Sequence, residues 1–487
     1  MSLTRRYFLQ LAAAAGASTA AINLQAQDRQ ASSSPNEKVG VAVIGAGGRG
    51  SSHLSAFSGA ADSEVLYICD VDEKAGRAKV KGVAEKQGRE PKFVQDFRSV
   101  LDDPSVDAIS TATPNHWHSL VSIWSMQAGK HVYTEKPVSH NVWEGRQMVN
   151  WARKLNKICQ CGTQSRSSPS LKEAVAYVQG GELGKIEYAI GTCYKPRKSI
   201  GKLDKPLEIP EYIDYDMWCG PAAMVDLYRP KLHYDWHWDF NTGNGDLGNQ
   251  GIHQMDIARW FLGEGQLSPR VMSIGGRIGY DDAGDTPNTQ IIYHDYEAAP
   301  LMFEVRGLPQ KDLDWKNGMD NFRGSQIGVI VQCEKGYIVC PSYTQCTAFD
   351  NDGKEIKKWT GGGDHFGNFL DAVKSGNHED LNADILEGHL SSALCHTGNI
   401  SHMLGSSKTA EQIRDQVKTN DLMADSFERL AKHVAANGVD ISDPKLSVGP
   451  WLEMDPDTET FPGNDAANKL LTRDYREGYV VPDGGNA

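Results

Sequence analysis

Lys136 stands in a segment whose residue types suit proton chemistry. Thr134-Glu135-Lys136-Pro137 follows the short apolar run His131–Thr134, and Pro137 restricts the backbone beside the lysine. A lysine ammonium can stabilise an oxygen that gains negative charge, and it can exchange a proton when its pKa is lowered. The segment therefore favours a catalytic lysine; a solvated lysine paired with Glu135 is the alternative.

His253 lies in a second segment that suits proton chemistry. The residues Leu247–Phe261 read as a helix, which places Asn249, His253 and Asp256 on one face at spacings of four and three residues. A histidine held beside an amide or a carboxylate is the arrangement of an oriented general base. The alternative is a buried histidine capped by Asp256.

A further pair of histidines, His233 and His237, is flanked by Asp235, Asp239 and several aromatic residues. Their spacing of four residues lacks the H-E-x-x-H pattern of a zinc site. We therefore expect this segment, and His237 in particular, to form a wall of a substrate site, and we predict no metal centre.

A glycine loop between a strand and a helix is the most informative motif. The apolar run Val41–Ile44 leads into Gly45-Ala46-Gly47-Gly48-Arg49-Gly50. Gly45 allows a tight turn, Gly47 lets the backbone approach a pyrophosphate, and Gly50 lets the helix pack against the strand. The helix N-terminus offers N–H groups and a positive dipole end to phosphates. The loop predicts dinucleotide binding, in preference to a chance glycine-rich turn.

Asp70 and two further turns complete the predicted cofactor site. Asp70 ends the next apolar run, about 20 residues after the loop, and is expected to bind both ribose hydroxyls. This favours NAD over NADP, because a 2′-phosphate would meet a carboxylate. Another strand is followed by Pro114-Asn115-His116-Trp117-His118, and this turn should lie at the border of the same site. The alternative is a Pro-Asn turn with a surface histidine. The predicted cofactor contacts are Gly45, Gly47, Gly48, Arg49, Gly50, Asp70, Thr113, Pro114, Asn115, His118, Glu135 and Lys136.

The elements that position these residues form an α/β domain, assigned to residues 36–162. Strand–helix alternation predicts a doubly wound parallel sheet, which is a Rossmann fold. The predicted strands are Val39–Ile44, Val65–Cys69, Ala108–Thr113, His131–Thr134 and Ile158–Cys161. The predicted helices are Arg49–Ser58, Glu73–Gln87, Trp117–Ala128 and Val142–Leu155.

After Gly162 the pattern changes to strands without intervening helices, which predicts a mixed, largely antiparallel sheet and an α+β domain over residues 163–405. The predicted strands are Ile186–Cys193, Val271–Ile278, Thr289–Tyr293, Leu301–Val305, Gly328–Cys333, Gly336–Cys340 and Thr347–Phe349. The predicted helices are Leu171–Val178, Leu247–Phe261, Asp364–Lys374 and Asp384–Leu404. Residues 406–487 form a helical and extended tail, and from Asn437 an arm is expected over the surface or a neighbouring subunit.

Residues 1–35 resemble an export signal with a polar linker. Arg5 and Arg6 precede a short, alanine-rich stretch and small residues up to Ala26, as in a twin-arginine signal. A membrane-spanning helix is the alternative, but the stretch is too short to span about 30 Å of hydrocarbon. We expect a periplasmic or otherwise exported protein that is not membrane-bound once the signal is removed.

Composition limits the classes of partner. The net charge is −13 over 487 residues, which argues against nucleic acid and anionic membranes as partners. The nine cysteines include no C-x-x-C pair, so neither a disulfide framework nor a zinc knuckle is indicated. Most of the cysteines are expected to be small buried residues.

Taken together, the motifs resemble those of one known family. The glycine loop, Pro114-Asn115-x-x-His118, Glu135-Lys136-Pro137 and the helix with His253 and Asp256 occur in the order seen in the Gfo/Idh/MocA family. The most similar branch carries twin-arginine signals and a long C-terminal extension. The resemblance implies a Rossmann domain and a mixed-sheet domain that supplies the substrate site and an oligomer interface, hence a homo-oligomer (dimer or tetramer). Family members mostly oxidise or reduce sugar and cyclitol hydroxyls with NAD or NADP.

The resemblance also implies residue roles. Lys136 matches the lysine that contacts substrate and nicotinamide, and His253 matches the catalytic histidine of a D-x-x-x-H motif. Asn249 stands where the family has an acid; an amide relays no proton but can hold the substrate or the histidine. Asp246 or Asp256 is the expected assistant to the base.

Several other residues are candidates for binding the carbohydrate. Tyr194 can stack on a sugar face. The basic residues Lys195, Arg197 and Arg166 would bind an acidic sugar or be merely solvated. The candidate substrate residues are Arg166, Tyr194, Lys195, His237 and Asp256.

Three functions follow from these patterns. The first is an NAD(P)-dependent oxidoreductase that acts on a sugar, sugar derivative or cyclitol hydroxyl and retains its cofactor, because free nucleotide is expected to be scarce outside the cytoplasm. The second is a glycoside-cleaving enzyme without net redox change. It would oxidise a sugar hydroxyl, eliminate the glycosidic group, add water and return the hydride. The third is a non-catalytic sugar-binding Rossmann protein, which the presence of both Lys136 and His253 disfavours.

Overall fold

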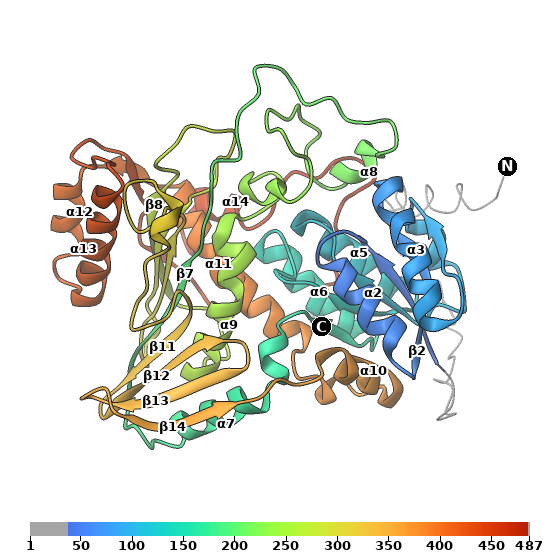
Figure 1. Cartoon of the computed structure of the whole chain (residues 1–487), viewed down its shortest axis with the longest axis horizontal. Helices are drawn as coiled ribbons and strands as arrows, with labels where there is room; N and C mark the ends of the chain where they lie inside the picture. Colours follow the sequence, from blue (N-terminus) through green and yellow to red (C-terminus); the bar gives the residue numbers. More distant parts are fainter. Residues whose placement is uncertain (1–37, 486–487) are drawn as a thin grey trace.

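The computed structural model describes residues 38–485, which form two sheets with helices packed against them (Figure 1). The first sheet is six-stranded, in the order β3-β2-β1-β4-β5-β6, and every pair in it is parallel. Its strands are β1 Val39–Ile44, β2 Ser63–Cys69, β3 Lys92–Val94, β4 Ala108–Thr111, β5 His131–Thr134 and β6 Cys159–Cys161. The predicted doubly wound sheet is confirmed. Sequence reasoning missed β3, which is short and only partly buried.

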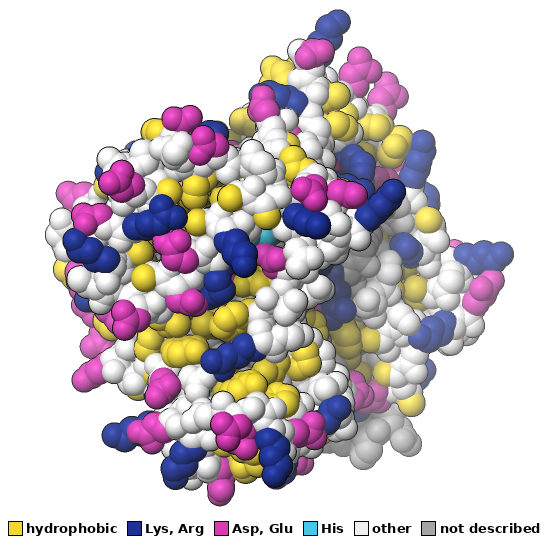
Figure 2. Space-filling model, turned by 60° about the vertical axis from the view of Figure 1, so that its left-hand side comes forward, with side chains coloured by type: hydrophobic (Ala, Val, Ile, Leu, Met, Phe, Trp, Pro, Cys, Tyr) yellow, Lys and Arg dark blue, Asp and Glu magenta, His cyan; other side chains and the backbone are white. Residues whose placement is uncertain are grey.

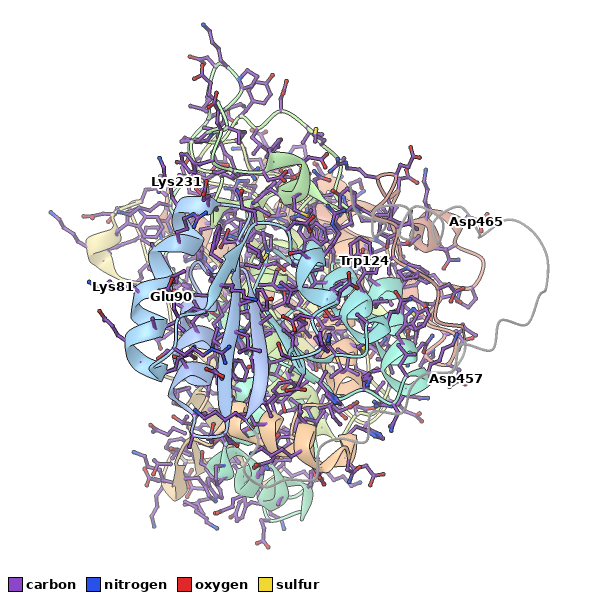
Figure 3. The ribbon with its side chains drawn as sticks, turned by 90° about the vertical axis from the view of Figure 1, so that its right-hand side faces the viewer. Lys81, Glu90, Trp124, Lys231, Asp457 and Asp465 are labelled. Atoms are coloured by element: carbon purple, nitrogen blue, oxygen red, sulfur yellow. The ribbon has the colours of Figure 1, made fainter. Side chains whose placement is uncertain are left out.

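Helices cover both faces of this sheet, as a doubly wound fold requires. One face packs on Leu54 and Phe57 of α2 and on Phe369 of α10; the other packs on Trp117 of α5 and Met148 of α6. In Figure 3, α3 with Lys81 lies on one side of the strands and Trp124 of α5 on the other. The helices are α2 Gly50–Gly59, α3 Glu73–Gln87, α4 Arg98–Leu101, α5 Asn115–Gln127 and α6 Val142–Lys154, joined by the late helix α10 His365–Ser375.

The second sheet is mixed, as predicted. Its strands run in the order β14-β13-β12-β11-β7-β10-β9-β8-β16-β15, with β17 paired to β8. The β7–β10 pair is parallel and the other pairs are antiparallel. The strands are β7 Ile186–Tyr194, β8 Arg270–Gly276, β9 Thr289–His294, β10 Leu301–Arg306, β11 Ile327–Cys333, β12 Gly336–Ser342, β13 Gln345–Asp350, β14 Glu355–Thr360, β15 Ser406–Lys408, β16 Leu446–Val448 and β17 Leu452–Glu453.

Different helices cover the two faces of the second sheet. Phe261 of α9 and Leu394 of α11 share a core with Phe303 on one face, whereas Phe427 of α13 packs with Met302 on the other. The helices are α7 Pro169–Gln179, α8 Tyr215–Cys219, α9 Ile252–Leu262, α11 Ile385–Met403, α12 Ala410–Val417, α13 Asp421–Ala436 and α14 Asp465–Lys469. Short 3-10 turns span Gln164–Ser167, Asp235–Trp238, Trp315–Asn317 and His378–Asp380.

Two irregular segments bear on the site. The predicted helix Leu247–Phe261 begins as a π-helical turn, Leu247–Gly251, and becomes α-helical only at Ile252. Between β7 and this turn, a long excursion reaches over the first sheet and carries α8, the green loop at the top of Figure 1.

The predicted arm lies on the chain's own surface. Leu471 accepts a backbone hydrogen bond from Trp143 of α6, and the Trp151 indole donates to Pro482. Arg476 and Tyr479 both contact Asp216 of α8. The arm therefore connects α6 to the long excursion.

Several expectations concern the chain as a whole. The predicted export signal lies outside the described residues. None of the described helices is long and apolar enough to cross a membrane. All nine cysteines are buried and unpaired, which confirms their expected character.

Candidate active site

The glycine loop has the shape that its sequence predicts. Gly45 adopts a φ of +82°, where a Cβ would lie 2.9 Å from the backbone of Ala112. A Cβ on Gly50 would lie 1.8 Å from the Gly45 carbonyl oxygen, so α2 packs directly on the end of β1. No atom lies within 4 Å of a Cβ placed on Gly47. This open space beside the α2 N-terminus is the place that a pyrophosphate requires.

Asp70 holds the glycine loop from the end of β2. Its carboxylate accepts hydrogen bonds from the backbone N–H groups of Ala46, at 2.8 Å, and Asp72, at 2.9 Å. Burial raises the pKa of Asp70, and these two hydrogen bonds oppose the increase. Carboxylate oxygens accept more than one hydrogen bond each, so Asp70 can still bind ribose hydroxyls.

Glu135 turns towards the glycine loop. Its carboxylate accepts from the Arg49 Nε at 2.8 Å and lies 3.1 Å from the His53 Nε2. Although burial disfavours the carboxylate, the His53 hydrogen bond and the Arg49 charge hold the pKa of Glu135 well below its ordinary value. Glu135 therefore fixes Arg49, and the alternative pairing of Lys136 with Glu135 is not found.

Lys136 instead reaches the π-helical turn. Its Nζ donates to the backbone carbonyl of Asn249 at 2.7 Å. Burial lowers the pKa of Lys136, and the charges of Arg49 and Lys195 lower it further, against the effect of Glu135. Asn249 contributes its main-chain carbonyl oxygen to this contact, whereas the sequence predicted a role for its side-chain amide. Turns of π-helical hydrogen bonding are frequent at functional sites.

His253 follows one turn later at the start of α9. The side chain is buried, and its Nδ1 has no hydrogen-bond partner among the described residues. Its ring lies 4.6 Å from that of Tyr343, between centroids. Burial, followed by the charge of Lys136, holds the pKa of His253 well below its ordinary value. The imidazole is therefore neutral near pH 7 and can accept a proton.

Neither predicted carboxylate assists His253. Asp246 forms a buried ion pair with Arg197, and Asp256 accepts from the Arg166 Nε at 2.9 Å and from Ser391 at 2.8 Å. Each aspartate neutralises an arginine that would otherwise be buried unpaired. Asp256 and Arg166 were predicted to bind substrate; the structure pairs them with each other, and their contact with substrate stays a prediction.

Tyr194 departs from its predicted role, and His118 forms contacts that the sequence did not predict. The Tyr194 hydroxyl donates to Glu304, which binds Arg429 of α13, so Tyr194 lies on the sheet face opposite α9. The alternation of side chains along β7 decides this. The two ring nitrogens of His118 lie 2.7 Å and 2.6 Å from the carbonyl oxygens of Thr113 and Pro137. His118 therefore connects these two loops, and its contact with the cofactor stays a prediction.

The remaining predicted residues lie at the edge between the two sheets. Pro114 precedes α5, and the Asn115 amide donates to Asn244 at 3.1 Å. His237 is buried; its Nε2 has no partner in the described part of the chain, and burial lowers its pKa to about 4. His233 binds Asp72 at 2.9 Å and does not meet His237. Within residues 38–485, no three His, Cys, Asp or Glu side chains form a group that could hold a metal ion.

Sequence reasoning missed the Gln250–Tyr343 pair. The Gln250 amide accepts from the Lys195 Nζ at 3.3 Å and donates to the Tyr343 hydroxyl at 2.7 Å. Tyr343 lies between β12 and β13, about 90 residues along the chain from Gln250. No sequence signal marks Tyr343, because only the sheet brings the two residues together.

Tyr234 is the second residue that sequence reasoning missed. It has φ 63° and ψ −48°, and the Asp235 N–H donates to the His233 carbonyl at 2.8 Å across it. This is the rare γ-turn whose central residue has a positive φ, a conformation that is strained. The Tyr234 side chain is 56% exposed, while its hydroxyl accepts from Arg197 at 2.8 Å. Strain of this kind concentrates at functional sites.

Comparison with known proteins assigns the family. Residues 39–163 match the profile described as "Oxidoreductase family, NAD-binding Rossmann fold", and residues 185–308 match that of the C-terminal alpha/beta domain of the same family. The chain belongs to the Gfo/Idh/MocA oxidoreductase family. NAD is thus the cofactor of this fold, and the open space at Gly47, the α2 N-terminus and Asp70 fit it.

The Gfo/Idh/MocA relatives include both dehydrogenases and hydrolases. Levoglucosan dehydrogenase of Pseudarthrobacter phenanthrenivorans is 25% identical over 49% of this chain and 54% of its own length. The scyllo-inositol 2-dehydrogenase (NAD(+)) of Bacillus subtilis is 31% identical over 32% of this chain and 44% of its own. An alpha-N-acetylgalactosaminidase of Shewanella oneidensis is 29% identical over 32% of this chain and 39% of its own length. The chain thus matches about half or less of the length of these relatives.

Solved structures of the family share the fold. Levoglucosan dehydrogenase in complex with NADH and levoglucosan has a TM-score of 0.55 at 19% identity, covering 74% of this chain and 98% of that one. The WlbA dehydrogenase of Bordetella pertussis in complex with NADH and UDP-GlcNAcA has a TM-score of 0.52 at 18% identity, covering 74% and 94%.

Proposed function

We propose that this protein is an oxidoreductase that oxidises or reduces a hydroxyl of a sugar, sugar derivative or cyclitol, with tightly retained NAD. The observation that carries the proposal is the pairing of a neutral, buried His253 with the Lys136 ammonium beside the glycine loop. A neutral imidazole accepts the proton of a substrate hydroxyl. The ammonium stabilises the alkoxide that this transfer creates. When bound, NAD supplies the hydride acceptor.

The surrounding residues hold these two groups in place. The Asn249 carbonyl fixes the Lys136 Nζ, and Glu135 with Arg49 joins the lysine strand to the glycine loop. Tyr343 packs against the His253 ring. Because the carboxylates nearby are each bonded to an arginine, His253 is the residue left to take the proton.

Cofactor retention, export and a homo-oligomeric state belong to the same proposal. The Arg5-Arg6 segment supports export of a folded protein, which can carry its nucleotide with it. An enzyme that cannot exchange its nucleotide must regenerate it on a second substrate.

Redox-neutral glycoside cleavage is the second candidate. It is favoured by the similarity to alpha-N-acetylgalactosaminidase and by His237, a second neutral imidazole with an unpartnered nitrogen. Elimination after oxidation needs a further acid–base group, which His237 can supply. This reaction releases an aglycone without net change in nucleotide redox state.

The test begins with protein purified natively. Denaturation should release nucleotide, whose identity and redox state are read by mass spectrometry, and the holoprotein is then screened on sugars and glycosides without added cofactor. Lys136→Met and His253→Ala should each lower turnover by about 10² to 10⁴-fold. Absence of nucleotide together with weak binding of added NAD would contradict retention. Normal turnover in both variants would refute the catalytic assignment.

A further inference from the structure

Two lysine ammonium groups meet at the π-helical turn without a carboxylate partner. Lys136 Nζ donates to the Asn249 carbonyl at 2.7 Å, and Lys195 Nζ donates to the Gln250 side-chain oxygen at 3.3 Å. Within residues 38–485, neither ammonium lies within salt-bridge distance of an acidic side chain. Both are held by neutral oxygens on consecutive residues.

The acidic side chains around the two lysines are already neutralised by arginines. Arg49 pairs with Glu135, Arg197 with Asp246, and Arg166 with Asp256. The nearby imidazoles His253 and His237 are neutral near pH 7. The site therefore carries excess positive charge although the chain as a whole has a net charge of −13. On the outer surface, by contrast, acidic and basic side chains are interspersed over the face shown in Figure 2.

Two hydrogen-bond donors at Gln250, the Lys195 ammonium and the Tyr343 hydroxyl, suit a ligand group with two oxygens. The Tyr343 hydroxyl accepts from the Gln250 Nε2 at 2.7 Å, so its own proton remains free to donate. The Lys195 Nζ and the Tyr343 hydroxyl contact the oxygen and the nitrogen of the same side-chain amide, that of Gln250. A singly charged carboxylate could accept from both. A phosphate dianion is bound best by an arginine that donates two parallel hydrogen bonds or by a cluster of backbone N–H groups. The arginines at this site are already paired with carboxylates.

We propose that the substrate carries a carboxylate, as in a uronic or aldonic acid, and that Lys195 binds it with Tyr343. This inference rests on the proposed function and narrows its substrate class. Lys195 comes from the end of β7 in the second sheet, whereas the glycine loop that faces the cofactor phosphates lies in the first sheet. The Lys195 charge is thus available to the substrate. Of the three basic candidates identified from the sequence, Lys195 is the one without an acidic partner among the described residues.

The experiment compares pairs that differ only in the carboxylate, such as glucuronate with glucose and galacturonate with galactose, on the nucleotide-loaded protein. The acidic member should show kcat/KM at least about 100-fold higher, because a neutral sugar leaves charged donors unsatisfied. Lys195→Met should reduce this preference to below about 10-fold, and Lys195→Arg should retain most of it. The matched control is Lys198→Met, an exposed lysine three residues away, which should leave the preference unchanged.

The outcomes separate this inference from the proposed function. A preference for the neutral member of each pair, or equal loss on both members in Lys195→Met, would overturn the carboxylate proposal while leaving the oxidoreductase intact. Binding of the acidic sugar is measured in parallel by calorimetry. Lys195-dependent binding without hydride transfer to or from any sugar would support the carboxylate site and contradict the proposed function.

Discussion

At the scale of the residue, ion pairs decide which groups remain free for chemistry. Glu135, Asp246 and Asp256 look equally able to assist a base, yet each is bonded to an arginine. A carboxylate that is bonded to an arginine is already engaged and is not left to accept the proton of a substrate hydroxyl. His253 and Lys136, held by uncharged neighbours, are the groups whose proton affinity the site has shifted.

The lowered pKa of His253 predicts the pH dependence of activity. The imidazole must be neutral to accept a proton, so the acid limb of kcat/KM for hydroxyl oxidation should lie below pH 6.5, the ordinary value for histidine. The Lys136 charge contributes to the shift, so the residual activity of Lys136→Met should show an acid limb moved upward. The measurement is a pH–rate profile, with Lys198→Met as a control that should not shift it. An acid limb that stays in place in Lys136→Met would contradict the assignment.

The strained backbone of Tyr234 predicts an inverted order of stability. At an unstrained position, alanine is more stable than glycine by about 0.4–1 kcal/mol. At φ 63° and ψ −48°, Tyr234→Gly should instead exceed Tyr234→Ala in free energy of unfolding by about 1–3 kcal/mol. Both variants lack the ring and its bond to Arg197, so their difference isolates the backbone. Urea unfolding of the two variants measures it, and the ordinary order would show that the turn is unstrained.

At the scale of the element, the β1–α2 connection separates folding from cofactor binding. Gly50→Ala would place a Cβ 1.8 Å from the Gly45 carbonyl oxygen and should disrupt the packing of α2. Gly47→Ala meets no atom within 4 Å, so this variant should lose retained nucleotide while keeping the melting temperature of nucleotide-free wild-type protein. Calorimetry and nucleotide release measure the two effects. Retention of nucleotide by Gly47→Ala would show that the phosphates lie elsewhere.

The C-terminal arm is a second element with a testable role. Arg473 donates to Asn241 through two nitrogens, at 2.9 and 2.8 Å, and Tyr479 stacks edge-on against Trp117. A chain ending at Thr472 should melt at a lower temperature and expose the excursion near Asp216 to proteolysis. Arg473→Met is the milder variant and should show the same direction. Unchanged cleavage rates would indicate that the excursion holds its position without the arm.

At the scale of the whole molecule, buried neutral histidines predict acid sensitivity. Burial is the leading cause that lowers the pKa of His116, His294 and His396 to about 3 and of His131, His237, His365 and His402 to about 4. The unfolded chain, with pKa values of about 6.5, binds these protons first. Stability is therefore full above pH 6.5 and falls as the pH drops, by about 1.4 kcal/mol per histidine in each pH unit.

The measurement is the free energy of unfolding in urea at pH 7.5, 6.5 and 5.5. With typical stabilities of about 5–15 kcal/mol, unfolding is expected within about two pH units below 6.5. His294→Phe should reduce the pH slope by about one proton. A constant free energy across this range would contradict the prediction.

Local sequence patterns were sufficient to predict the first sheet, the glycine loop and the candidate residues Lys136 and His253. These features depend on local patterns: apolar runs, helical spacing, and the spacing of glycines directly after a strand. The second, mixed sheet was also predictable. Residues 406–487 were expected to be partly helical, but the bounds of α12 and α13 were not predicted, because the core that stabilises these helices is provided by β8–β10. Short strands such as β3 gave no pattern to detect.

Which charged residues are free depends on contacts between distant parts of the chain. Arg166, Arg197 and Lys195 look alike in the sequence, but Asp256 and Asp246 take the two arginines, and Lys195 is left with Gln250. Tyr194 and Lys195 are neighbours in the chain, yet Tyr194 binds Glu304 on the far face of the sheet. Pairings of this kind join residues about 50 to 110 positions apart, and burial makes each unpaired charge costly. No local pattern carries that information.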